Sequence, residues 1–298
     1  MTRIEQFGWR GPVEPGIGRI VSAHGDYYHL VCNEQPTGEI LARKKKSAFT
    51  RMKTAAPDSM KGKKISERRA EQPPQPITGD FVRFRHNPQG DSMITEVLPR
   101  FSHFERKDPT ARRTSQTLAV NFDTLFIMMS LNENFSTARI RRYLDLAADM
   151  GEAEPVVVLT KSDLLDEEEK RGGDGQWKEL LSPLSASAFS LHLVSSLTGE
   201  GLDRLAPYLA PGRTVAFIGS SGVGKSTLLN TLVGEEWQAT QEIQEWSGKG
   251  RHTTTSRELV MLPSGAMVID TPGIREIGMI GERDDVLVKG ESTHRYRK

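Results

Sequence analysis

The octapeptide GSSGVGKS at residues 219–226 constrains this chain more than any other short segment. It fits the pattern G-x-x-x-x-G-K-[ST], follows an apolar run at residues 214–218 and precedes a helical run at residues 226–232. In such a strand–loop–helix unit the glycines let successive backbone N–H groups turn toward phosphate oxygens, and the helix N-terminus adds the positive end of its dipole. The octapeptide therefore predicts a phosphate-binding loop.

Two side chains of this loop have predicted roles in holding a nucleotide. Lys225 is expected to reach the β- and γ-phosphates, and the Ser226 hydroxyl is expected to bind magnesium. The loop residues predicted to bind the nucleotide are Gly219, Ser220, Ser221, Gly222, Val223, Gly224, Lys225, Ser226 and Thr227.

Two segments at the ends of other apolar runs predict which base is bound. Residues 160–163 read TKSD, and the Asp163 carboxylate can accept hydrogen bonds from the N1 and N2 donors of guanine, which adenine does not offer. The stem of Lys161 can lie along the base, and backbone N–H groups after the run at residues 191–195 can meet guanine O6. The residues predicted to bind the base are Thr160, Lys161, Asp163, Ser195 and Ser196.

The last two segments predict a sensor of the γ-phosphate. Residues 270–273 read DTPG, in which Asp270 is expected to hold magnesium through water and the Gly273 N–H to meet the γ-phosphate. Residues 251–255 read RHTTT. One of its threonines, for which we choose Thr254, is expected to bind magnesium only while the γ-phosphate is present.

The residue after the DTPG segment bears on catalysis. Position 274, where Ras-type switches place a glutamine that orients the attacking water, is isoleucine. Since isoleucine cannot hold water, unassisted hydrolysis should be slow, or another residue must serve. His252 is the nearest candidate, although a single loop histidine is more often only exposed.

The order of the segments and the apolar runs together predict an α/β fold with permuted connectivity. The base-reading segments precede the phosphate loop, which reverses the usual order in guanine-nucleotide-binding proteins. Buried runs at residues 124–130, 155–160, 191–195 and 214–218 alternate with helical stretches such as residues 136–151. This alternation indicates a doubly wound parallel sheet.

The first third of the chain has a different pattern. Short β-type runs separated by turn residues occur at residues 18–23, 27–32, 38–42, 81–85 and 92–98. Short strands at this spacing indicate a small closed barrel. The predicted organisation is a lead and barrel at residues 1–100, a polar linker at 101–117, the α/β domain at 118–281 and a basic tail at 282–298.

Composition excludes several classes of protein. The net charge is +1, so global charge indicates no polyanionic partner, and the basic run at residues 40–70 is typical of a solvated loop. The single cysteine, Cys32, excludes an internal disulfide and a thiol-rich zinc site. No apolar run approaches about 18 residues and no signal core opens the chain, so we expect a cytoplasmic protein with no membrane partner. We also expect a monomer.

With these residues in place, the chain resembles the circularly permuted GTPases of ribosome assembly, and most closely the ribosome small-subunit-dependent GTPase A family. The resemblance rests on residues 76–80 (PxxGD), 160–163, 194–205, 219–227, 250–255 and 270–276. The GRHTTT segment at residues 250–255 is the most specific of these. The resemblance implies an OB-fold at residues 15–100, contact with 16S ribosomal RNA, and Mg²⁺-dependent GTP hydrolysis stimulated by the 30S subunit. It also implies that His252 is catalytic.

The resemblance implies an RNA-binding surface on the barrel as well. The basic residues expected to contact RNA are Arg43, Lys44, Lys45, Lys46, Arg51 and Lys53. Aromatic residues of the right type for stacking on bases are Tyr27, Tyr28, Phe81 and Phe84, of which strand alternation assigns at least half to the barrel core.

Members of this family usually carry a zinc domain with three cysteine ligands and one histidine after DTPG. This chain has no cysteine beyond Cys32, so we expect no zinc ligands in it, whether by natural loss or by shortening.

Two other functions stay open from the residues alone. One is an RNA-binding module with a structural guanine nucleotide, which Ile274 favours. The other is a P-loop kinase, which leaves TKSD and DTPG without roles.

Overall fold

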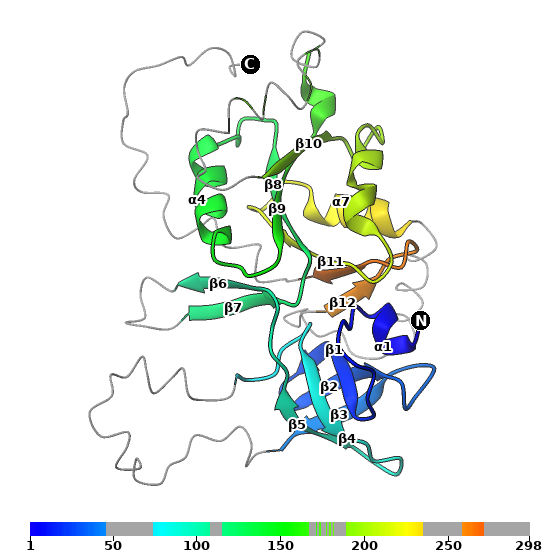
Figure 1. The fold of residues 1–298 in the computed structure, drawn as a ribbon. Coiled ribbons are helices and arrows are strands. Elements are labelled where there is room, and N and C mark those ends of the chain that lie inside the picture. The colour runs from blue at the N-terminus through cyan, green and yellow to red at the C-terminus, as the bar shows by residue number, and fades with distance from the viewer. Residues whose placement is uncertain are drawn as a thin grey trace, which may run out of the picture. The chain divides into compact units, whose positions relative to one another are not determined.

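The structure is a computed structural model that describes residues 1–45, 74–107, 115–166, 189–234 and 258–270, together with helical positions 171, 173, 177, 179 and 181. It divides into two compact units (Figure 1). The first comprises Met1–Arg100 with Ser256–Leu259, and the second comprises Phe101–Thr255 with Val260–Lys298.

The first unit is a closed five-stranded barrel. Its strands are β1 (Ile17–His24), β2 (Tyr27–Cys32), β3 (Ile40–Lys44), β4 (Phe81–Arg85) and β5 (Ser92–Val97). They lie in the order β1-β2-β3-β5-β4, and β1 also pairs with β4, which closes the barrel. Only β3 and β5 run parallel among these pairs. The barrel predicted from the alternating runs is confirmed, and it is OB-like.

Three of the four aromatic side chains considered for stacking on RNA are buried in the barrel unit. Tyr28, Phe81 and Phe84 are 3%, 2% and 4% exposed, whereas Tyr27 is 39% exposed. Tyr28 and Phe84 belong to the barrel core, and Phe81 packs against Trp9 and Arg19, so none of these three rings is free to stack on RNA. Tyr27 lies on the outer surface beside Arg43, whose guanidinium is 4.3 Å from the ring centroid.

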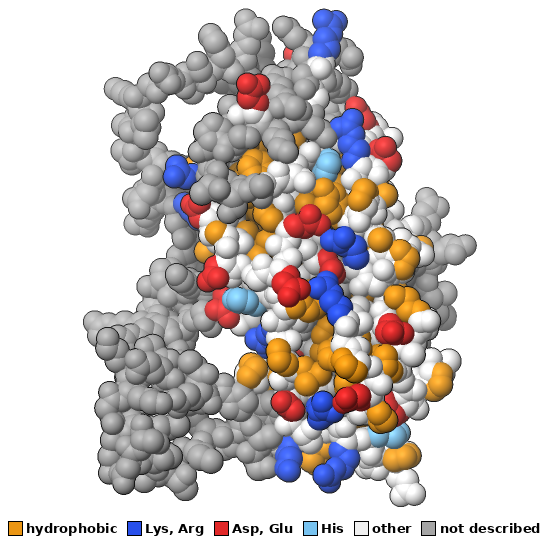
Figure 2. All heavy atoms as spheres, in the orientation of Figure 1, with side chains coloured by type: hydrophobic (Ala, Val, Ile, Leu, Met, Phe, Trp, Pro, Cys, Tyr) orange, Lys and Arg blue, Asp and Glu red, His pale blue; other side chains and the backbone are white. Residues whose placement is uncertain are grey.

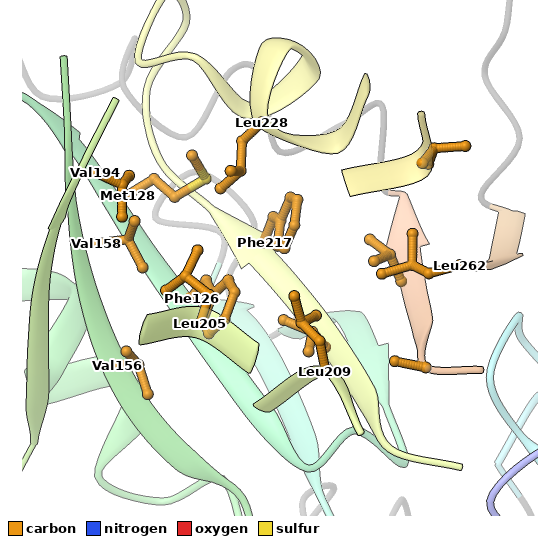
Figure 3. Close-up of a cluster of buried hydrophobic side chains, with 14 of the residues drawn as sticks. Phe126, Met128, Val156, Val158, Val194, Leu205, Leu209, Phe217, Leu228 and Leu262 are labelled. Carbon is orange, nitrogen blue, oxygen red and sulfur yellow. The ribbon is translucent and has the colours of Figure 1, made fainter. Parts of the chain in front are cut away.

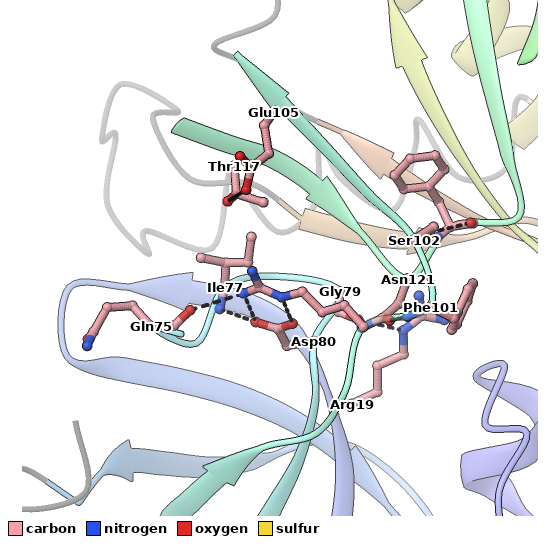
Figure 4. A network of polar contacts seen from close by, with 12 residues as sticks. Arg19, Gln75, Ile77, Gly79, Asp80, Phe101, Ser102, Glu105, Thr117 and Asn121 are labelled. Atoms are coloured by element: carbon pink, nitrogen blue, oxygen red, sulfur yellow. Dashed lines mark hydrogen bonds and ion pairs between the residues drawn. The ribbon is translucent and has the colours of Figure 1, made fainter. Parts of the chain in front are cut away.

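The PxxGD segment has a structural role in the barrel unit (Figure 4). Arg100 donates from Nε and Nη2 to the two carboxylate oxygens of Asp80, over 2.7 and 2.8 Å. The Ile77 N–H also donates to Asp80, over 2.9 Å. Burial raises the pKa of the Asp80 carboxyl, and the Arg100 guanidinium opposes that shift. This network holds the entry to β4 in place.

The short helix α1 (Arg3–Gln6) is fastened to the same unit. Ile4 is fully buried. The fully buried Arg19 donates to the Phe7 carbonyl oxygen over 2.6 Å, and its guanidinium lies 4.8 Å from the Phe81 ring centroid. The residues before β1, in which no element was predicted, are thus packed structure.

The second unit is built on a parallel sheet. The strands β8 (Thr124–Ser130), β9 (Glu154–Thr160), β10 (Ser190–Val194), β11 (Thr214–Ile218) and β13 (Met267–Asp270) lie in the order β10-β9-β8-β11-β13. All four neighbouring pairs are parallel. In the strand order β13 is followed by β12 (Glu258–Met261), whose residues are divided between the two units. The predicted α/β fold is confirmed.

Helices pack on this sheet through apolar side chains. The helical elements are α4 (Thr137–Ala147), η2 (Ser162–Leu164), η4 (Leu202–Leu209) and α7 (Lys225–Val233). One buried cluster joins sheet residues such as Phe126 and Phe217, which stack 5.6 Å apart, to Leu205 of η4 and Leu228 of α7 (Figure 3). Helix α4 begins after Ser136, whose hydroxyl accepts from the Arg139 N–H over 3.3 Å. This N-cap accounts for the predicted start of the helix.

Part of the predicted linker at residues 101–117 is paired structure. It contains β6 (His103–Lys107) and the start of β7 (Ser115–Val120), which form a two-stranded antiparallel sheet. Phe104 is only 1% exposed, so this stretch has a buried face as well as a polar one. No strand was predicted in this stretch, and the structure adds this pair.

Candidate nucleotide-binding site

The phosphate loop joins β11 directly to α7, as the octapeptide predicted. Gly222 and Gly224 have φ angles of +77° and +93°, which lie in the left-handed region that favours glycine. At Gly219 a Cβ atom would lie 2.6 Å from the Met128 carbonyl oxygen on the neighbouring strand. The three glycines are therefore required by the shape of the loop and by its close approach to β8.

The lysine of the loop lies across the loop itself. Lys225 Nζ donates to the carbonyl oxygens of Gly219 and Ser220, over 2.6 and 2.7 Å. These bonds hold a positive charge against the loop backbone, where phosphates bind in such a unit. Ser226 and Thr227 are exposed in the first turn of α7, and Ser221 is exposed in the loop.

The two base-reading segments are hydrogen-bonded to each other. The Ser195 hydroxyl, directly after β10, donates to Asp163 Oδ1 over 2.5 Å. Ser195 is buried, while Asp163 is half-buried and lies in η2 after β9. Lys161, two residues before Asp163, has a left-handed backbone with φ +62°. Two side chains that are 32 positions apart in sequence are thus joined by one hydrogen bond.

The loop that contains Ser195 and Ser196 is tightly closed. The Ser195 N–H donates to the Glu200 carbonyl oxygen over 2.9 Å, and the Gly199 N–H donates back to the Ser195 carbonyl oxygen over 2.9 Å. At Gly201 a Cβ would lie 2.1 Å from the Leu193 carbonyl oxygen. These hydrogen bonds and this close approach give the loop a defined shape.

A hydrogen bond also joins the base side to the phosphate side. The Thr160 hydroxyl, at the end of β9, donates to the Val223 carbonyl oxygen in the phosphate loop over 2.6 Å. Thr160 and Val223 are both buried. The predicted residues Thr160, Asp163, Ser195, Val223 and Lys225 are therefore gathered at the carboxyl end of the parallel strands, where such sheets bind ligands.

Sequence reasoning missed Arg139. This half-buried side chain of α4 donates from Nη1 to the Ser220 hydroxyl of the phosphate loop over 3.3 Å. The helical run was predicted, but periodicity alone does not show that one of its arginines reaches the loop.

Several predicted residues lie outside the described part of the chain. These are the catalytic candidate His252, the magnesium candidate Thr254, and Gly273. Asp270 is the last residue of β13, and its side chain is also outside the described part. Asp270 ends β13, and Ser226 lies in α7, which follows the neighbouring parallel strand β11. Hydroxyl and carboxylate oxygens suit Mg²⁺. In the described residues, no group of three or more His, Cys, Asp or Glu side chains is arranged to hold a metal.

The predicted RNA surface is only partly described. Arg43 and Lys44 belong to β3 and Lys45 follows it, whereas Lys46, Arg51 and Lys53 lie outside the described residues. Arg43 Nε is 2.6 Å from Asp91 Oδ2, and Lys44 Nζ is 3.3 Å from Asp26 Oδ1. On the face drawn in Figure 2, acidic and basic side chains are interspersed. This part of the barrel is thus less positive than its basic residues suggest.

The parallel sheet, the phosphate loop and the bonded base-reading segments define a P-loop nucleotide-binding unit in which the base side precedes the phosphate side. Residues 97–280 match the sequence model described as RsgA GTPase. The chain belongs to the RsgA GTPase family.

Curated relatives support this assignment. The chain is 39% identical to "Small ribosomal subunit biogenesis GTPase RsgA 2" of Lactiplantibacillus plantarum, over 88% of this chain and 66% of that protein. It is 46% identical to a protein of the same name from Vibrio vulnificus, over 68% of this chain and 55% of the relative. It is 35% identical to "Small ribosomal subunit biogenesis GTPase RsgA" of Leptospira interrogans, over 94% of this chain and 72% of that protein. The matches thus span 55 to 72% of the length of these relatives.

Solved structures show the same fold. YjeQ from Thermotoga maritima is 25% identical with a TM-score of 0.56, over 86% of this chain and 74% of that chain. YloQ, titled a circularly permuted GTPase, is 22% identical with a TM-score of 0.55, over 86% of this chain and 70% of that chain. Among the described residues, no helix is both long and apolar enough to cross a membrane.

Proposed function

We propose that this chain binds GTP with Mg²⁺ and hydrolyses it as an assembly factor of the small ribosomal subunit. The observation that carries the proposal is the pair of hydrogen bonds from Ser195 to Asp163 and from Thr160 to Val223. They tie the base-reading and phosphate-binding segments together at one edge of the sheet. A single guanine nucleotide fits that arrangement, because its base and phosphates need both groups of donors and acceptors at once.

Each residue has a defined task in this proposal. Asp163 accepts from guanine N1 and N2, and Lys225 neutralises the β- and γ-phosphates. Ser226 and Asp270 provide oxygens for Mg²⁺, which offsets phosphate charge when it is bound. His252 orients the attacking water, since Ile274 cannot.

The names of the relatives support the proposed partners. Those proteins are named for small ribosomal subunit biogenesis. We place this chain in the cytoplasm as a monomer that binds the 30S subunit and its 16S ribosomal RNA while GTP is bound. Loss of the γ-phosphate would release residues 251–255 and 270–276 and weaken that binding.

Phosphate release measured with 30S subunits, with 50S subunits and with no ribosome tests the reaction. We expect clear stimulation by 30S subunits alone, and no activity above background for Lys225→Ala. The variant His252→Ala should bind GTP normally but hydrolyse it more slowly. Turnover that 30S subunits leave unchanged would favour the alternative, an RNA-binding module with a structural nucleotide, which Ile274 also favours.

A filter assay of 30S binding tests the gating step. The chain should bind 30S subunits more tightly with a non-hydrolysable GTP analogue than with GDP. Equal affinity in the two nucleotide states would rule out release driven by hydrolysis.

A further inference from the structure

Three exposed apolar side chains lie together on the outer side of the barrel strands β2, β3 and β5. Tyr27, Leu41 and Met93 are 39%, 37% and 44% exposed. They are three of the five large hydrophobic side chains that the described part of the first unit exposes. Single exposed apolar residues are ordinary on a protein surface, whereas a contiguous group of them marks a surface that binds a partner.

The register of the strands makes this group contiguous. Arg43 of β3 is paired with Tyr27 on β2 and with Met93 on β5, so these three residues form one row across the sheet. Leu41 lies two residues before Arg43 on the same side of β3 and is paired with His29. Paired residues on one side of a sheet are only about 5 Å apart, so the apolar side chains surround Arg43. We call this group the outer patch: Tyr27, Leu41, Arg43 and Met93.

Basic side chains in and beside the outer patch are neutralised within the barrel unit. Three of them lie within 3.3 Å of a carboxylate oxygen: Arg43 of Asp91, Lys44 of Asp26, and His29 of Glu39. An RNA phosphate would have to displace these carboxylates or lie beside their negative charge. The release of counterions that drives phosphate binding is therefore small here. The outer patch thus has an apolar centre and a nearly neutral rim.

The exposed aromatic ring of the outer patch is already in contact with a cation. The Arg43 guanidinium lies 4.3 Å from the centroid of the Tyr27 ring, and it also donates to the Tyr27 hydroxyl oxygen. One face of the ring is therefore covered, which leaves less of it for a nucleotide base to stack on. Tyrosine, arginine and methionine are, in contrast, the residues enriched at the centres of protein–protein interfaces. The composition and the charge of the outer patch both favour a protein partner over RNA.

We propose that the outer patch binds a protein of the small ribosomal subunit by apolar contact. This inference rests on the proposed function, because it takes the small subunit as the partner. The protein segment that covers the patch presents apolar side chains and little net charge, since the cations of the patch and its rim are already paired. Arg43 then serves a protein contact, and the contacts of this chain with ribosomal RNA lie elsewhere on its surface.

Binding of the full chain to purified 30S subunits and to protein-free 16S ribosomal RNA, both with a non-hydrolysable GTP analogue, tests the choice of partner. Met93→Ala should weaken binding to 30S subunits about tenfold, which is the loss expected when roughly half of the burial of a methionine is removed. Its binding to the protein-free RNA should equal that of the wild type. Because the lost contact is apolar, the ratio between variant and wild-type affinity for 30S subunits should be the same at low and at high salt.

A charge placed in the outer patch separates the two kinds of partner by the sign of its effect. Leu41→Lys should weaken binding to 30S subunits if the patch meets an apolar protein surface, and should strengthen it if the patch meets RNA phosphates. Val13→Lys is the matched control, because Val13 is 44% exposed in the same unit but lies outside the patch. It measures the general attraction of an added lysine to the subunit.

Two further measurements exclude effects on folding. Met93→Leu keeps an apolar side chain of similar size and should restore most of the binding that Met93→Ala loses. The midpoint of urea unfolding should be the same for Met93→Ala as for the wild type, because the Met93 side chain is exposed in the unbound chain.

The outcomes separate the inference from the proposed function. If the wild type binds 30S subunits and Met93→Ala binds them just as tightly, the inference is overturned while the proposed function stands. It is also overturned if Met93→Ala loses affinity for the protein-free RNA to the same extent, or if Leu41→Lys binds 30S subunits as tightly as Val13→Lys or more tightly. If the wild type itself binds no 30S subunits, the proposed function fails and takes the inference with it.

Discussion

The hydroxyl of Thr160 is hydrogen-bonded to the carbonyl oxygen of Val223 over 2.6 Å, so the strand that leads into the base-reading segment is bonded to the phosphate loop. The two residues are 63 positions apart in the chain. In a permuted sequence, this bond is one of the contacts that make a single site from separated segments.

Replacing Thr160 with Val tests the importance of that bond. The valine keeps the shape of the side chain but leaves the buried Val223 carbonyl oxygen without its donor, which should cost about 1–2 kcal/mol of unfolding free energy. Urea unfolding measures the change, and affinity for GDP should fall with it. In the control Thr231→Val, an exposed hydroxyl bonded within its own helix is lost, and the change should stay within about 0.5 kcal/mol. Equal effects of the two variants would contradict a special role for Thr160.

Arg139 should affect nucleotide binding although it was not among the predicted site residues. Its hydrogen bond to Ser220 supports the phosphate loop from α4. Arg139→Gln should weaken GDP binding by about fivefold, which corresponds to about 1 kcal/mol for one charged hydrogen bond of this length. Arg141→Gln on the same helix is the matched control, since Arg141 is 61% exposed and pairs only loosely with Asp145 over 4.0 Å. Unchanged GDP affinity in Arg139→Gln would show that the loop does not need this support.

The variant Asp163→Asn should change the base that is preferred. The amide can donate where the carboxylate only accepts, so xanthine, with a carbonyl at position 2, replaces guanine as the better partner. We expect GDP affinity to fall by about ten- to a hundredfold, because GDP loses one or two hydrogen bonds to residue 163. XDP affinity should rise, because XDP gains such a bond. Competition titrations with the two diphosphates measure the switch. A variant that still prefers GDP would remove Asp163 from base recognition.

Alkaline pH should destabilise each unit through one buried tyrosine. Burial raises the pKa of Tyr143, in α4, above its ordinary value of 10.0, and burial likewise raises the pKa of Tyr28 in the barrel. The unfolded chain therefore loses these protons first. The contribution of each tyrosine to the free energy of unfolding is fully present below about pH 10. It declines as pH rises from there through the folded-state pKa. Urea unfolding between pH 9 and 11 should show a smaller decline for Tyr143→Phe and for Tyr28→Phe than for the wild type. An unaltered slope in both variants would contradict this assignment.

The elements that could be predicted from the sequence are those whose side chains repeat with one period. The β8 and β11 runs are buried throughout, and the alternation in β4 marked the barrel strand. The phosphate loop was predictable because backbone shape demands glycine at fixed positions, as the close approach of Gly219 to Met128 shows.

The features that were missed depend on tertiary packing. Strands β6 and β7 carry polar side chains beside Phe104 and Leu118, which are 1% and 3% exposed, so their apolar face is too narrow to mark a strand by pattern. The contact from Arg139 to Ser220 depends on how α4 is rotated against the sheet, which periodicity does not define. The burial of Phe81 depends partly on Trp9, whose ring lies 5.1 Å away and comes from a segment with no predicted element.

The most direct test of a single guanine-nucleotide pocket is a competition titration, in which a fluorescent GDP bound to the wild-type chain is displaced by GDP or by ADP in the presence of Mg²⁺. One ligand must then satisfy both the carboxylate of Asp163 and the amine of Lys225. We predict that GDP displaces the probe at least a hundredfold more effectively than ADP, an estimate of about 3 kcal/mol for the base-specific hydrogen bonds. Displacement by ADP as effective as displacement by GDP would show that the base-reading segments and the phosphate loop do not serve the same nucleotide.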